Sequence, residues 1–283
     1  MPTKTDYLAT GFADVDSAGE GAFLRCLELL DSLPYFRQYK EETYRRLELR
    51  PGLSVLDVGC GLGDDCARIS ARVSPGGAVT GLDTSRSMIA SAVRRWPGRA
   101  NLTFAIGDAR MLPFASGSFD RVRSDRSLQH IARPATAVAE LYRVLAPGGL
   151  ALVYDNDWGT FSVSSERLPI TRRLQEMWCY SFTNPWIGRH LGLLFKQAGF
   201  EELSVLPRVS VITDFATADR VYDLQKTLER LTASAEITQD EADDWRDELL
   251  RQTSDGVFQT SLTAYMVVGR KPTAPHRPEQ RGA

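Results

Sequence analysis

Val55-Leu56-Asp57-Val58-Gly59-Cys60-Gly61-Leu62-Gly63 is the stretch of the chain that decides the fold. The apolar run at 53–58 predicts a buried strand, and the alternate glycines let the backbone turn sharply into a helix over 64–73. Such glycines also let a ligand lie against the backbone, next to the free N–H groups that begin a helix. A plain strand-to-helix turn is the alternative, and the sequence around the stretch argues against it.

The same alternation of strand and helix continues on the C-terminal side. Repeats of this kind predict an α/β fold, doubly wound around an open parallel sheet. Ligands bind beyond the carboxyl ends of such strands, where we expect Asp57, Asp83, Asp108 and Asp155. The expected strands are 78–83, 102–106, 119–123 and 150–154, and the expected helices are 85–96 and 134–145.

The remaining segments divide the chain into three parts. The first twenty residues are interpreted as a loose arm, followed by two helices over 20–49 that Pro34 separates. The pattern lapses between Asp155 and Trp186. Further on we expect a helix at 189–198, a strand at 202–207, two charged helices over 216–251 split near Ile237, and a last strand at 259–269. The predicted division is an arm with cap helices (1–50), a ligand-binding domain (51–270) with a substrate-side insert (156–186) and a helical lid insert (214–256), and a disordered tail (271–283).

Composition excludes several classes of protein. The 283 residues include 34 basic and 36 acidic ones, so the net charge of -2 argues against a nucleic-acid binder. No apolar run reaches the roughly 18 residues that a membrane span needs, and no apolar signal segment is expected. The four cysteines and three histidines show no metal-ligand spacing, so no metal site is predicted. Reduced cysteines favour a cytoplasmic protein.

The charge of the glycine stretch narrows the class of ligand. A pyrophosphate-binding motif places its third glycine where this chain has Asp64, beside Asp65, and two carboxylates there repel a diphosphate. A ligand with a cationic centre and no phosphate, such as S-adenosylmethionine, fits better. Asp83 follows Gly61 by 22 residues and is placed to accept hydrogen bonds from both ribose hydroxyls, or else to cap the next helix. Asp108 is expected at the adenine amino group, or in a turn.

Five motifs in order resemble the class I S-adenosylmethionine-dependent methyltransferases, most of all the small-molecule branch that includes quinone C-methyltransferases. The motifs are D-V-G-C-G-L-G, G-L-D-T-S, G-D-A-R-M-L-P-F, S-F-D-R-V-R-S and R-V-L-A-P-G-G, within residues 53–155. The resemblance implies a Rossmann-like, mostly parallel, seven-stranded sheet whose last strand is antiparallel, which 259–269 would supply. The aromatic segment 156–186 and the helical insert depart from the quinone methylases, which leaves a quinone substrate in doubt.

The resemblance also implies which residues hold the cofactor. Asp57 and the loop of Gly59, Cys60, Gly61 and Gly63 would hold the methionine part, and Asp83 the ribose. The remaining implied residues are Thr84 and Met88 beside the adenosine, Asp108 and Ala109 at the adenine, and Ser124 and Gln129 below the sulfonium.

Candidate catalytic groups lie after the fourth and fifth strands. Methyl transfer needs mainly alignment, and a base only where the acceptor atom must lose a proton. His130 is the candidate base, with a purely hydrogen-bonding histidine as the alternative. Asp155 and Asp157 are expected to face the crevice and orient a substrate, or to form an Asp-rich turn.

Aromatic residues are the candidates for a substrate pocket, with core packing as the alternative for all of them. Tyr39, with Tyr35 and Phe36, is expected near the cofactor. The helical insert is interpreted as a lid or a homodimer contact, or as a solvated surface. The other candidates follow the fifth strand: Trp158, Phe161, Trp178, Tyr180, Phe182 and Trp186.

The sequence thus predicts a cytoplasmic methyltransferase of secondary metabolism. It would move a methyl group from S-adenosylmethionine to an oxygen, nitrogen or carbon atom of an apolar or aromatic, natural-product-like small molecule. A nicotinamide-dependent oxidoreductase and a cofactor-binding protein without methyl transfer are the alternatives. Neither nucleic acid nor a membrane is an expected partner.

Overall fold

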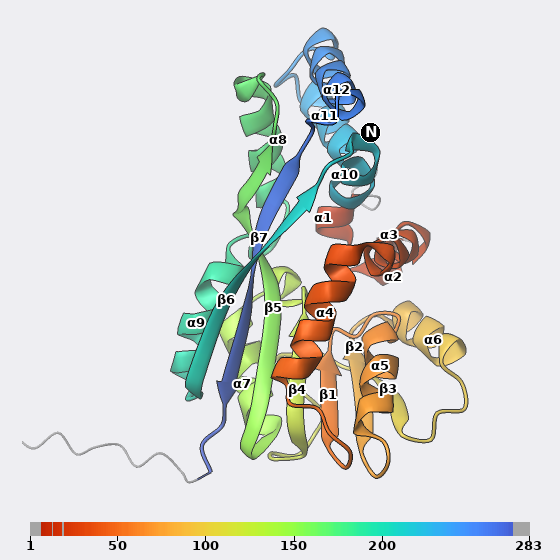
Figure 1. The fold of residues 1–283 in the computed structure, drawn as a ribbon, viewed down its shortest axis with the longest axis vertical. Coiled ribbons are helices and arrows are strands. Elements are labelled where there is room, and N and C mark those ends of the chain that lie inside the picture. The colour runs from red at the N-terminus through yellow and green to blue at the C-terminus, as the bar shows by residue number, and fades with distance from the viewer. Residues whose placement is uncertain (1–6, 13, 19, 274–283) are drawn as a thin grey trace, which may run out of the picture.

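A seven-stranded sheet in the order β3-β2-β1-β4-β5-β7-β6 runs through the computed structural model, which describes residues 7–12, 14–18 and 20–273. Strands β1 to β5 are parallel, and β7 pairs antiparallel with both β5 and β6 (Figure 1). The strands are β1 (Ser54–Val58), β2 (Ala78–Asp83), β3 (Leu102–Ile106), β4 (Phe119–Asp125), β5 (Leu145–Val163), β6 (Glu201–Ile212) and β7 (Thr260–Arg270). The predicted Rossmann-like sheet with an antiparallel last strand is confirmed.

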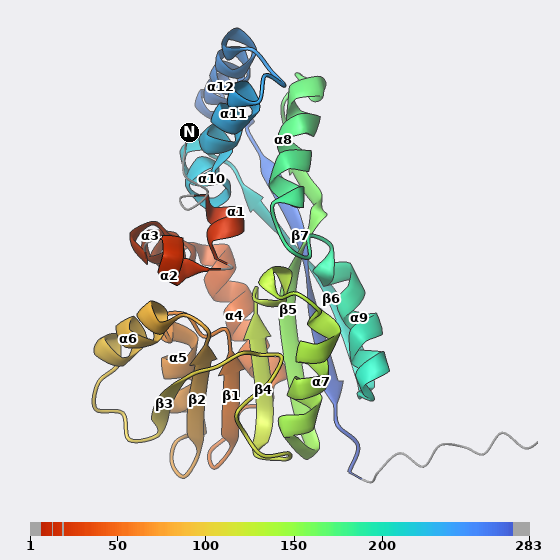
Figure 2. The ribbon, with the colours of Figure 1, turned by 180° about the vertical axis from the view of Figure 1, so that it is seen from behind.

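Helices cover both faces of the parallel part. On one face lie α4 (Pro34–Arg46) and α5 (Asp64–Val73), and on the other α7 (Pro134–Val144) and α9 (Ile187–Ala198), as the two views show (Figures 1 and 2). The helix α6 (Arg86–Arg95) joins β2 to β3. Apolar residues recur every three or four positions along these helices, so each turns one stripe toward the sheet.

Strands β5, β6 and β7 continue well beyond the parallel part. The extension carries α8 (Leu168–Tyr180) beside β5 and three further helices, α10 (Phe215–Tyr222), α11 (Leu224–Ala233) and α12 (Gln239–Ser254) (Figures 1 and 2). α8 packs against α11 and α12. The sequence placed the end of the fifth strand at 154 and missed α8. Residues 150–158 are buried throughout, and a strand covered on both faces lacks the alternation that marks a strand. The insert holds three helices rather than two.

Residues 7–12 and 14–18 are part of the packed structure, which corrects the prediction of a loose arm for these residues. Two short helices, α1 (Leu8–Gly11) and α2 (Val15–Ala18), precede α3 (Glu20–Ser32). Tyr7 Oη lies 2.8 Å from Thr227 Oγ1, and the backbone N–H of Leu8 donates to Asp223 Oδ2 at 2.7 Å. Helices of four residues are too short to show a periodicity, so only these distant contacts define them.

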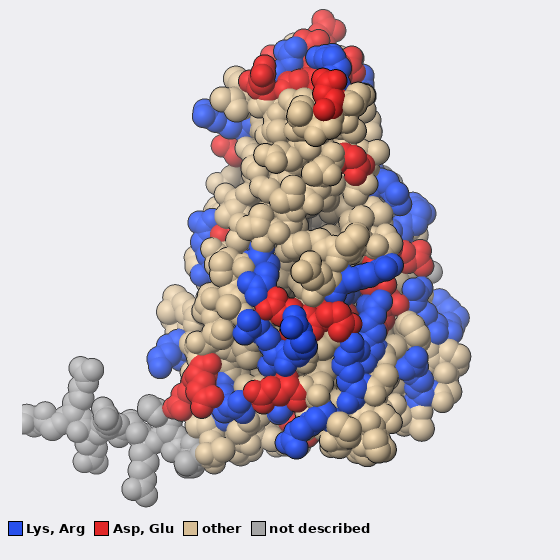
Figure 3. All heavy atoms as spheres, in the orientation of Figure 1, with Lys and Arg blue, Asp and Glu red and all other residues tan. Residues whose placement is uncertain are grey.

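The start of the segment predicted as a disordered tail is ordered as far as the chain is described, through residue 273. Lys271 belongs to the fold, because its Nζ donates to the carbonyl oxygens of Tyr142 and Leu145 at 2.9 and 2.7 Å. The rest of that prediction, from residue 274, lies outside the described residues. Acidic and basic side chains are mixed over the lower half and the upper tip of the face in Figure 3, with a largely uncharged band between. None of the helices described is both long and apolar enough for a membrane span.

Candidate active site

A cavity of about 350 Å³ lies at the carboxyl ends of β1 to β4, where the parallel sheet predicts a ligand. This large cavity is closed on one side by Phe12, Val15 and Leu27 from the N-terminal helices. Nine residues singled out in the sequence meet in its wall: Gly59, Gly61, Asp83, Thr84, Met88, Asp108, Ala109, Gln129 and His130.

The glycine loop has the backbone that only glycine adopts readily. Gly59, Gly61 and Gly63 have φ values of 76°, 50° and 73°. A Cβ on Gly59 would lie 1.9 Å from Ser127 Oγ, and one on Gly63 would lie 2.5 Å from the ring of Phe104. Gly59 and Gly61 face the large cavity, whereas Gly63 faces the protein interior.

Asp83 ends β2 and holds the glycine loop against it. Its Oδ2 accepts from the backbone N–H of Gly61 at 2.9 Å, and its Oδ1 accepts from that of Ser85 at 3.0 Å. Ser85, not Asp83, is the N-cap of α6, because its Oγ accepts from Met88 N. Burial raises the pKa of Asp83. A carboxylate has about four lone-pair sites, so two backbone bonds leave acceptor capacity toward the cavity.

Asp16 of α2 fastens the N-terminal segment to the same edge. One carboxylate oxygen accepts from Ser85 Oγ at 2.6 Å and from Ser87 Oγ at 2.7 Å, and the other accepts from Arg86 N at 2.9 Å. The hydrogen bonds from Ser85 and Ser87 hold the pKa of Asp16 well below its usual range. The cover over the large cavity is therefore tied to α6.

Asp108, at the end of β3, is engaged by a residue that the sequence did not single out. Arg110 donates to its two oxygens from Nε and Nη2, and the Arg110 backbone N–H donates to Oδ1 at 2.8 Å. This is the turn that was the alternative interpretation. The ion pair with Arg110 lowers the pKa of Asp108. Asp108 nevertheless lines the large cavity, so its predicted contact with the cofactor stays a prediction.

Asp57 lies beneath the loop rather than in the cavity wall. The register of β1 and β4 places it beside Arg123, whose Nη1 donates to Asp57 Oδ1 at 3.0 Å. Arg123 Nη2 donates to Asp125 Oδ2 at 2.8 Å and lies 3.3 Å from Asp65. Arg123 is 1% exposed, and its charge is offset by these carboxylates. Asp57 therefore supports the strand end through Arg123.

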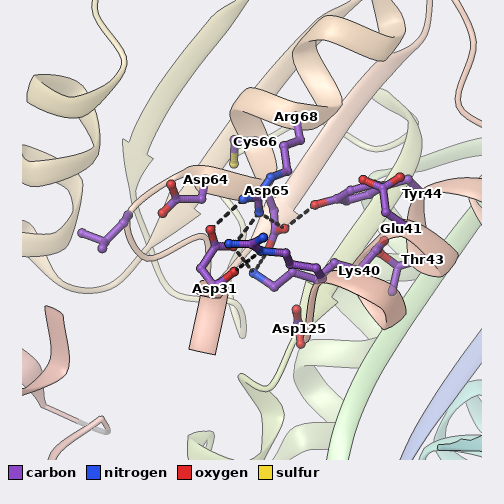
Figure 4. Close-up of polar contacts among 12 residues, drawn as sticks. Asp31, Lys40, Glu41, Thr43, Tyr44, Asp64, Asp65, Cys66, Arg68 and Asp125 are labelled. Atoms are coloured by element: carbon purple, nitrogen blue, oxygen red, sulfur yellow. Dashed lines mark hydrogen bonds and ion pairs between the residues drawn. The ribbon is translucent and has the colours of Figure 1, made fainter. Parts of the chain in front are cut away.

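Asp65 joins three helices in a second group of charges (Figure 4). Lys40 Nζ donates to Asp65 Oδ2 at 2.9 Å, Tyr44 Oη donates to Oδ1, and Arg68 binds Asp31 through two bonds of 2.7 Å. Although burial opposes its ionisation, Arg123 and Lys40 lower the pKa of Asp65. A polar hollow of about 70 Å³ beside the glycine loop is lined by charges of both signs, including Asp31, Lys40, Asp64, Asp65 and Arg126, and by Cys60.

The segment after β4 separates the large cavity from its neighbour. Gln129 has a fixed orientation, because its Oε1 accepts from Trp158 Nε1 at 2.9 Å and from Asn156 Nδ2 at 3.2 Å. Its amide nitrogen donates to the carbonyl of Arg126 and lies 3.0 Å from His130 Nε2. Ser124 is fully buried and does not line the cavity. Its predicted contact with the cofactor is not supported.

His130 is neutral and accepts a hydrogen bond in this network. The Gln129 amide donates to its Nε2, so the ring proton is assigned to Nδ1. Burial and the charge of Arg126 lower the pKa of His130 to about 3. Its only basic nitrogen is occupied, which does not support the prediction of a general base.

An aromatic cavity lies on the other side of this wall. It has a volume of about 60 Å³ and shares Phe12, Arg126, Gln129 and His130 with the large cavity. Half of its remaining lining residues are aromatic: Tyr35, Phe36, Tyr154, Trp158, Trp178, Phe182 and Tyr222. The rings of Trp158 and Phe182 stack at 4.4 Å. Trp158 and Trp178, which the sequence analysis named as candidates for a substrate pocket, therefore line this cavity.

Three other aromatic candidates lie elsewhere. Tyr39 stacks on Tyr154 at 4.0 Å and donates from its Oη to Asp125, so it stands behind the cavity wall. Tyr180 and Trp186 contact each other on the outer surface and are 67% and 37% exposed. The expectation that these two wall the pocket is wrong, because α8 turns Trp178 inward and Tyr180 outward.

Asp155 and Asp157 face away from both cavities. Because β5 continues past them, alternate residues point to opposite faces, and Tyr154, Asn156 and Trp158 take the face of the aromatic cavity. Asp155 accepts from the backbone N–H groups of Leu128 and Gln129 at 2.8 and 3.3 Å. Burial raises the pKa of Asp155 to about 7. The expectation that they face the crevice is wrong.

Asp157 has a structural partner on α9. Its carboxylate binds Arg189 through bonds of 2.6 and 2.8 Å and is 1% exposed on its side chain. The pair anchors α9 to β5 outside both cavities. A catalytic role is supported for neither aspartate.

Arg126 is the main functional candidate that the sequence analysis missed. It lines the large cavity, the aromatic cavity and the polar hollow, with its guanidinium 5.2 Å from the Phe36 ring. Its φ of 53° is unusual for a residue with a side chain, and its N–H donates to Tyr154 O at 2.7 Å. An arginine directly after a buried strand was the available signal. Among the residues described, no His, Cys, Asp or Glu group is arranged to hold a metal.

Comparisons with known proteins identify the family. Residues 55–149 match the family model of a methyltransferase domain. The chain is 36% identical over 245 residues to an uncharacterized 37.1 kDa protein in transposon Tn4556 of Streptomyces fradiae, covering 86% of this chain and 70% of that protein. It is 33% identical over 165 residues to the demethylmenaquinone methyltransferase of Lactococcus lactis, covering 56% of this chain and 62% of that enzyme.

The fold is also found among solved structures. The phosphoethanolamine N-methyltransferase 2 of Haemonchus contortus, crystallised with S-adenosyl-L-methionine, superposes with a TM-score of 0.54 at 22% identity, covering 93% of this chain and 60% of that one. The strand order, the loop of three left-handed glycines and the sequence matches agree, and the chain belongs to the class I S-adenosylmethionine-dependent methyltransferases.

Proposed function

We propose that this protein transfers a methyl group from S-adenosylmethionine to an oxygen, nitrogen or carbon atom of an apolar or aromatic small molecule. One observation carries the proposal. A large cavity with a glycine loop and Asp83 shares a wall with an aromatic cavity, and Phe12, Arg126, Gln129 and His130 form that wall. Such an arrangement suits two ligands that must meet end to end.

The residues of the large cavity fit the cofactor. Asp83 has acceptor capacity for the ribose hydroxyls, and Gly59 and Gly61 present bare backbone to the cavity. Asp108 and Ala109 line the part of the cavity where we expect the adenine, and Met88 offers an apolar contact. The charges of both signs in the polar hollow suit the amino and carboxylate groups of the methionine part. When bound, the cofactor supplies a methyl group already activated by the sulfonium.

The chain itself then contributes alignment and exclusion of water. Holding two reactants in a productive geometry is worth up to about 7–11 kcal/mol of the barrier. Tyr154, Trp158 and Phe182 supply rigid apolar walls for the acceptor molecule. The N-terminal helices cover the aromatic cavity through Leu8 and Leu30 and the large cavity through Leu27, and Phe12 lines both. This cover would keep water from the reacting atoms.

The described wall of the aromatic cavity offers no general base to the acceptor. His130 is neutral, and its basic nitrogen is already hydrogen-bonded. Within the described part of the chain, no Asp or Glu lines the aromatic cavity. The arrangement favours an acceptor atom that is nucleophilic without losing a proton to the protein.

Calorimetry with S-adenosylhomocysteine tests the proposal. The wild-type protein should bind it, and Asp83→Ala should weaken binding by at least about tenfold, or about 1.4 kcal/mol. Asp243→Ala, on the outer face of α12, is the control for loss of an acidic side chain. Equal affinities in the two variants would reject the cofactor site.

Turnover distinguishes the proposal from a protein that only binds the cofactor. Wild-type protein with radiolabelled S-adenosylmethionine should methylate at least one member of a panel of phenols, aromatic acids, amines and indoles. Tight cofactor binding with no product over the whole panel would favour the binding protein. The cytoplasmic location, the lid role of 214–256 and a homodimer remain predictions.

A further inference from the structure

The aromatic cavity is lined by residues with buried donors that have no hydrogen-bond partner in the described part of the chain. Arg126 Nε, His130 Nδ1 and Trp178 Nε1 are each inaccessible to solvent and have no hydrogen-bond partner among the described residues. All three residues line this one cavity. More than about 90% of buried polar groups in proteins are paired, and an unpaired one costs about 1–3 kcal/mol. Three unpaired donors around one small apolar cavity indicate a ligand that accepts hydrogen bonds from them.

All three groups are donors. The Nε–H of arginine and the indole N–H of tryptophan have no acceptor form. His130 belongs with them because the fixed orientation of Gln129 assigns the ring proton to Nδ1. The complementary ligand therefore presents acceptors at this end and no N–H or O–H of its own.

The charge around the cavity favours an anionic acceptor. Arg126 is its only cation among the described lining residues, and no acidic side chain lines it. Asp125 Oδ1 lies 3.5 Å from Arg126 Nε, too far for a hydrogen bond, and Asp125 already accepts from Arg123. The planar guanidinium fork matches a carboxylate in shape, so an incoming carboxylate would use donors that Asp125 leaves free.

We propose that the methyl acceptor is an aromatic acid, whose carboxylate is held by Arg126 and His130 while its ring packs against Trp158, Phe182 and Tyr222. The inference rests on the proposed function, since it names the substrate class of the same site. Arg126 lies where the two cavities meet, so this contact would also fix the distance between the substrate and the cofactor. Trp178 Nε1 is left for a second acceptor deeper in the cavity.

Three naphthalene probes of matched shape test the substrate class by calorimetry on protein saturated with S-adenosylhomocysteine. The probes are 2-naphthoate, the neutral acceptor 2-acetylnaphthalene and the cationic donor 2-(aminomethyl)naphthalene. We expect 2-naphthoate to bind at least about tenfold more tightly than the ketone, and the amine to bind weakest. An amine that binds as tightly as the acid would overturn the inference.

Variants of Arg126 and His130 test which residues cause the preference for 2-naphthoate. Arg126→Gln should lose about tenfold in affinity for 2-naphthoate and little for the ketone, and Arg126→Lys should lie between because it keeps the charge without the fork. Arg94→Gln, an exposed cation on α6, is the matched control. His130→Asn keeps a donor near the Nδ1 position and should bind 2-naphthoate almost normally, whereas His130→Phe should not. If Arg126→Gln fails to fold, the comparison of His130→Asn with His130→Phe still tests the proposal.

The two proposals fail in different ways. Wild-type protein that binds S-adenosylhomocysteine but shows no preference among the three probes would overturn the aromatic acid and leave the methyltransferase standing. A preference for 2-naphthoate in protein that does not bind S-adenosylhomocysteine would overturn the methyltransferase and leave the acid site standing.

Discussion

The large cavity and the aromatic cavity are built from different kinds of sequence. The large cavity takes most of its wall from four short segments at successive strand ends, within residues 58–61, 82–88, 107–110 and 125–132. The aromatic cavity takes its wall from segments that range from Leu8 to Leu262. One is the product of local motifs on a sheet, and the other exists only once distant parts of the chain have packed. Changes in the two should therefore have separable effects.

The largest effect is expected for Arg123→Leu, in the buried support beneath the glycine loop. The substitution leaves Asp57, Asp65 and Asp125 without their common cation. We expect the free energy of unfolding to fall by about 3–5 kcal/mol, as when one partner of a buried ion pair is removed. Urea unfolding followed by circular dichroism measures this loss.

Arg246→Leu is the matched control for that prediction. Arg246 forms a partly exposed ion pair with Asp243 on α12 at 2.9 Å, and its loss should cost at most about 1 kcal/mol. Similar losses in the two variants would mean that the buried network contributes no more to stability than a surface pair does.

The next prediction distinguishes the close approach at Gly59 from the backbone strain that a side chain causes at any positive φ. Gly59→Ala should weaken S-adenosylhomocysteine binding by at least about 100-fold, because a Cβ there would lie 1.9 Å from Ser127 Oγ and displace one side of the large cavity. Gly98→Ala is the control, since Gly98 has a φ of 74°, close to the 76° of Gly59, and open space around it. Calorimetry of both variants makes the comparison, and equal affinities would show that the close approach is unimportant.

The contrast between the two cavities also explains which parts the sequence could predict. The bounds of α5 and β2 agree with the expected 64–73 and 78–83, because glycine, proline and a change of period mark each end. The positions of Gly59, Asp83 and Asp108 follow from the same local rules. A residue's place at a strand end is local information.

The substrate side depends on information that no single segment carries. The extension of β5 to Val163 is buried on both faces as far as Trp158, so the sequence there shows no alternation of apolar and polar residues. For this reason the faces of Asp155 and Asp157 were assigned wrongly. The roles of Arg123 and Arg126 depend on partners in other elements, such as Asp57 and Tyr154. The tautomer of His130 depends on Trp158 fixing Gln129.

A smaller effect is expected when the aromatic cavity alone is filled. Val221 lines it from α10 and does not line the large cavity. Val221→Trp should lower methyl transfer by at least about tenfold and leave the affinity for S-adenosylhomocysteine within about threefold of wild type. Val93→Trp, at an exposed position on α6, controls for the added ring. A parallel loss of cofactor binding would show that the two cavities are not separable.

The smallest effect concerns the wall that the two cavities share. His130 is held neutral by burial and by Arg126, which lower its pKa to about 3, whereas an unfolded histidine titrates near pH 6.5. Below about pH 6.5 the imidazole of His130 is protonated in the unfolded chain but stays neutral in the folded chain. The contribution of His130 to folding stability is therefore lost as the pH falls. His130→Asn removes the difference. Between about pH 6.5 and 5.5, wild type should lose about 1 kcal/mol more stability than the variant.

Asp155 contributes with the opposite sign, because its raised pKa of about 7 favours the folded state at lower pH. Because Asp155 is present in wild type and in His130→Asn, its contribution cancels when the urea unfolding of these two proteins is compared at the two pH values. His190→Asn, at an exposed position on α9, controls for the loss of a histidine. If wild type and His130→Asn lose equal stability on acidification, His130 accepts protons in the folded state. Its Nδ1 would then not be the fixed, neutral donor from which the aromatic cavity derives its preference for an acid.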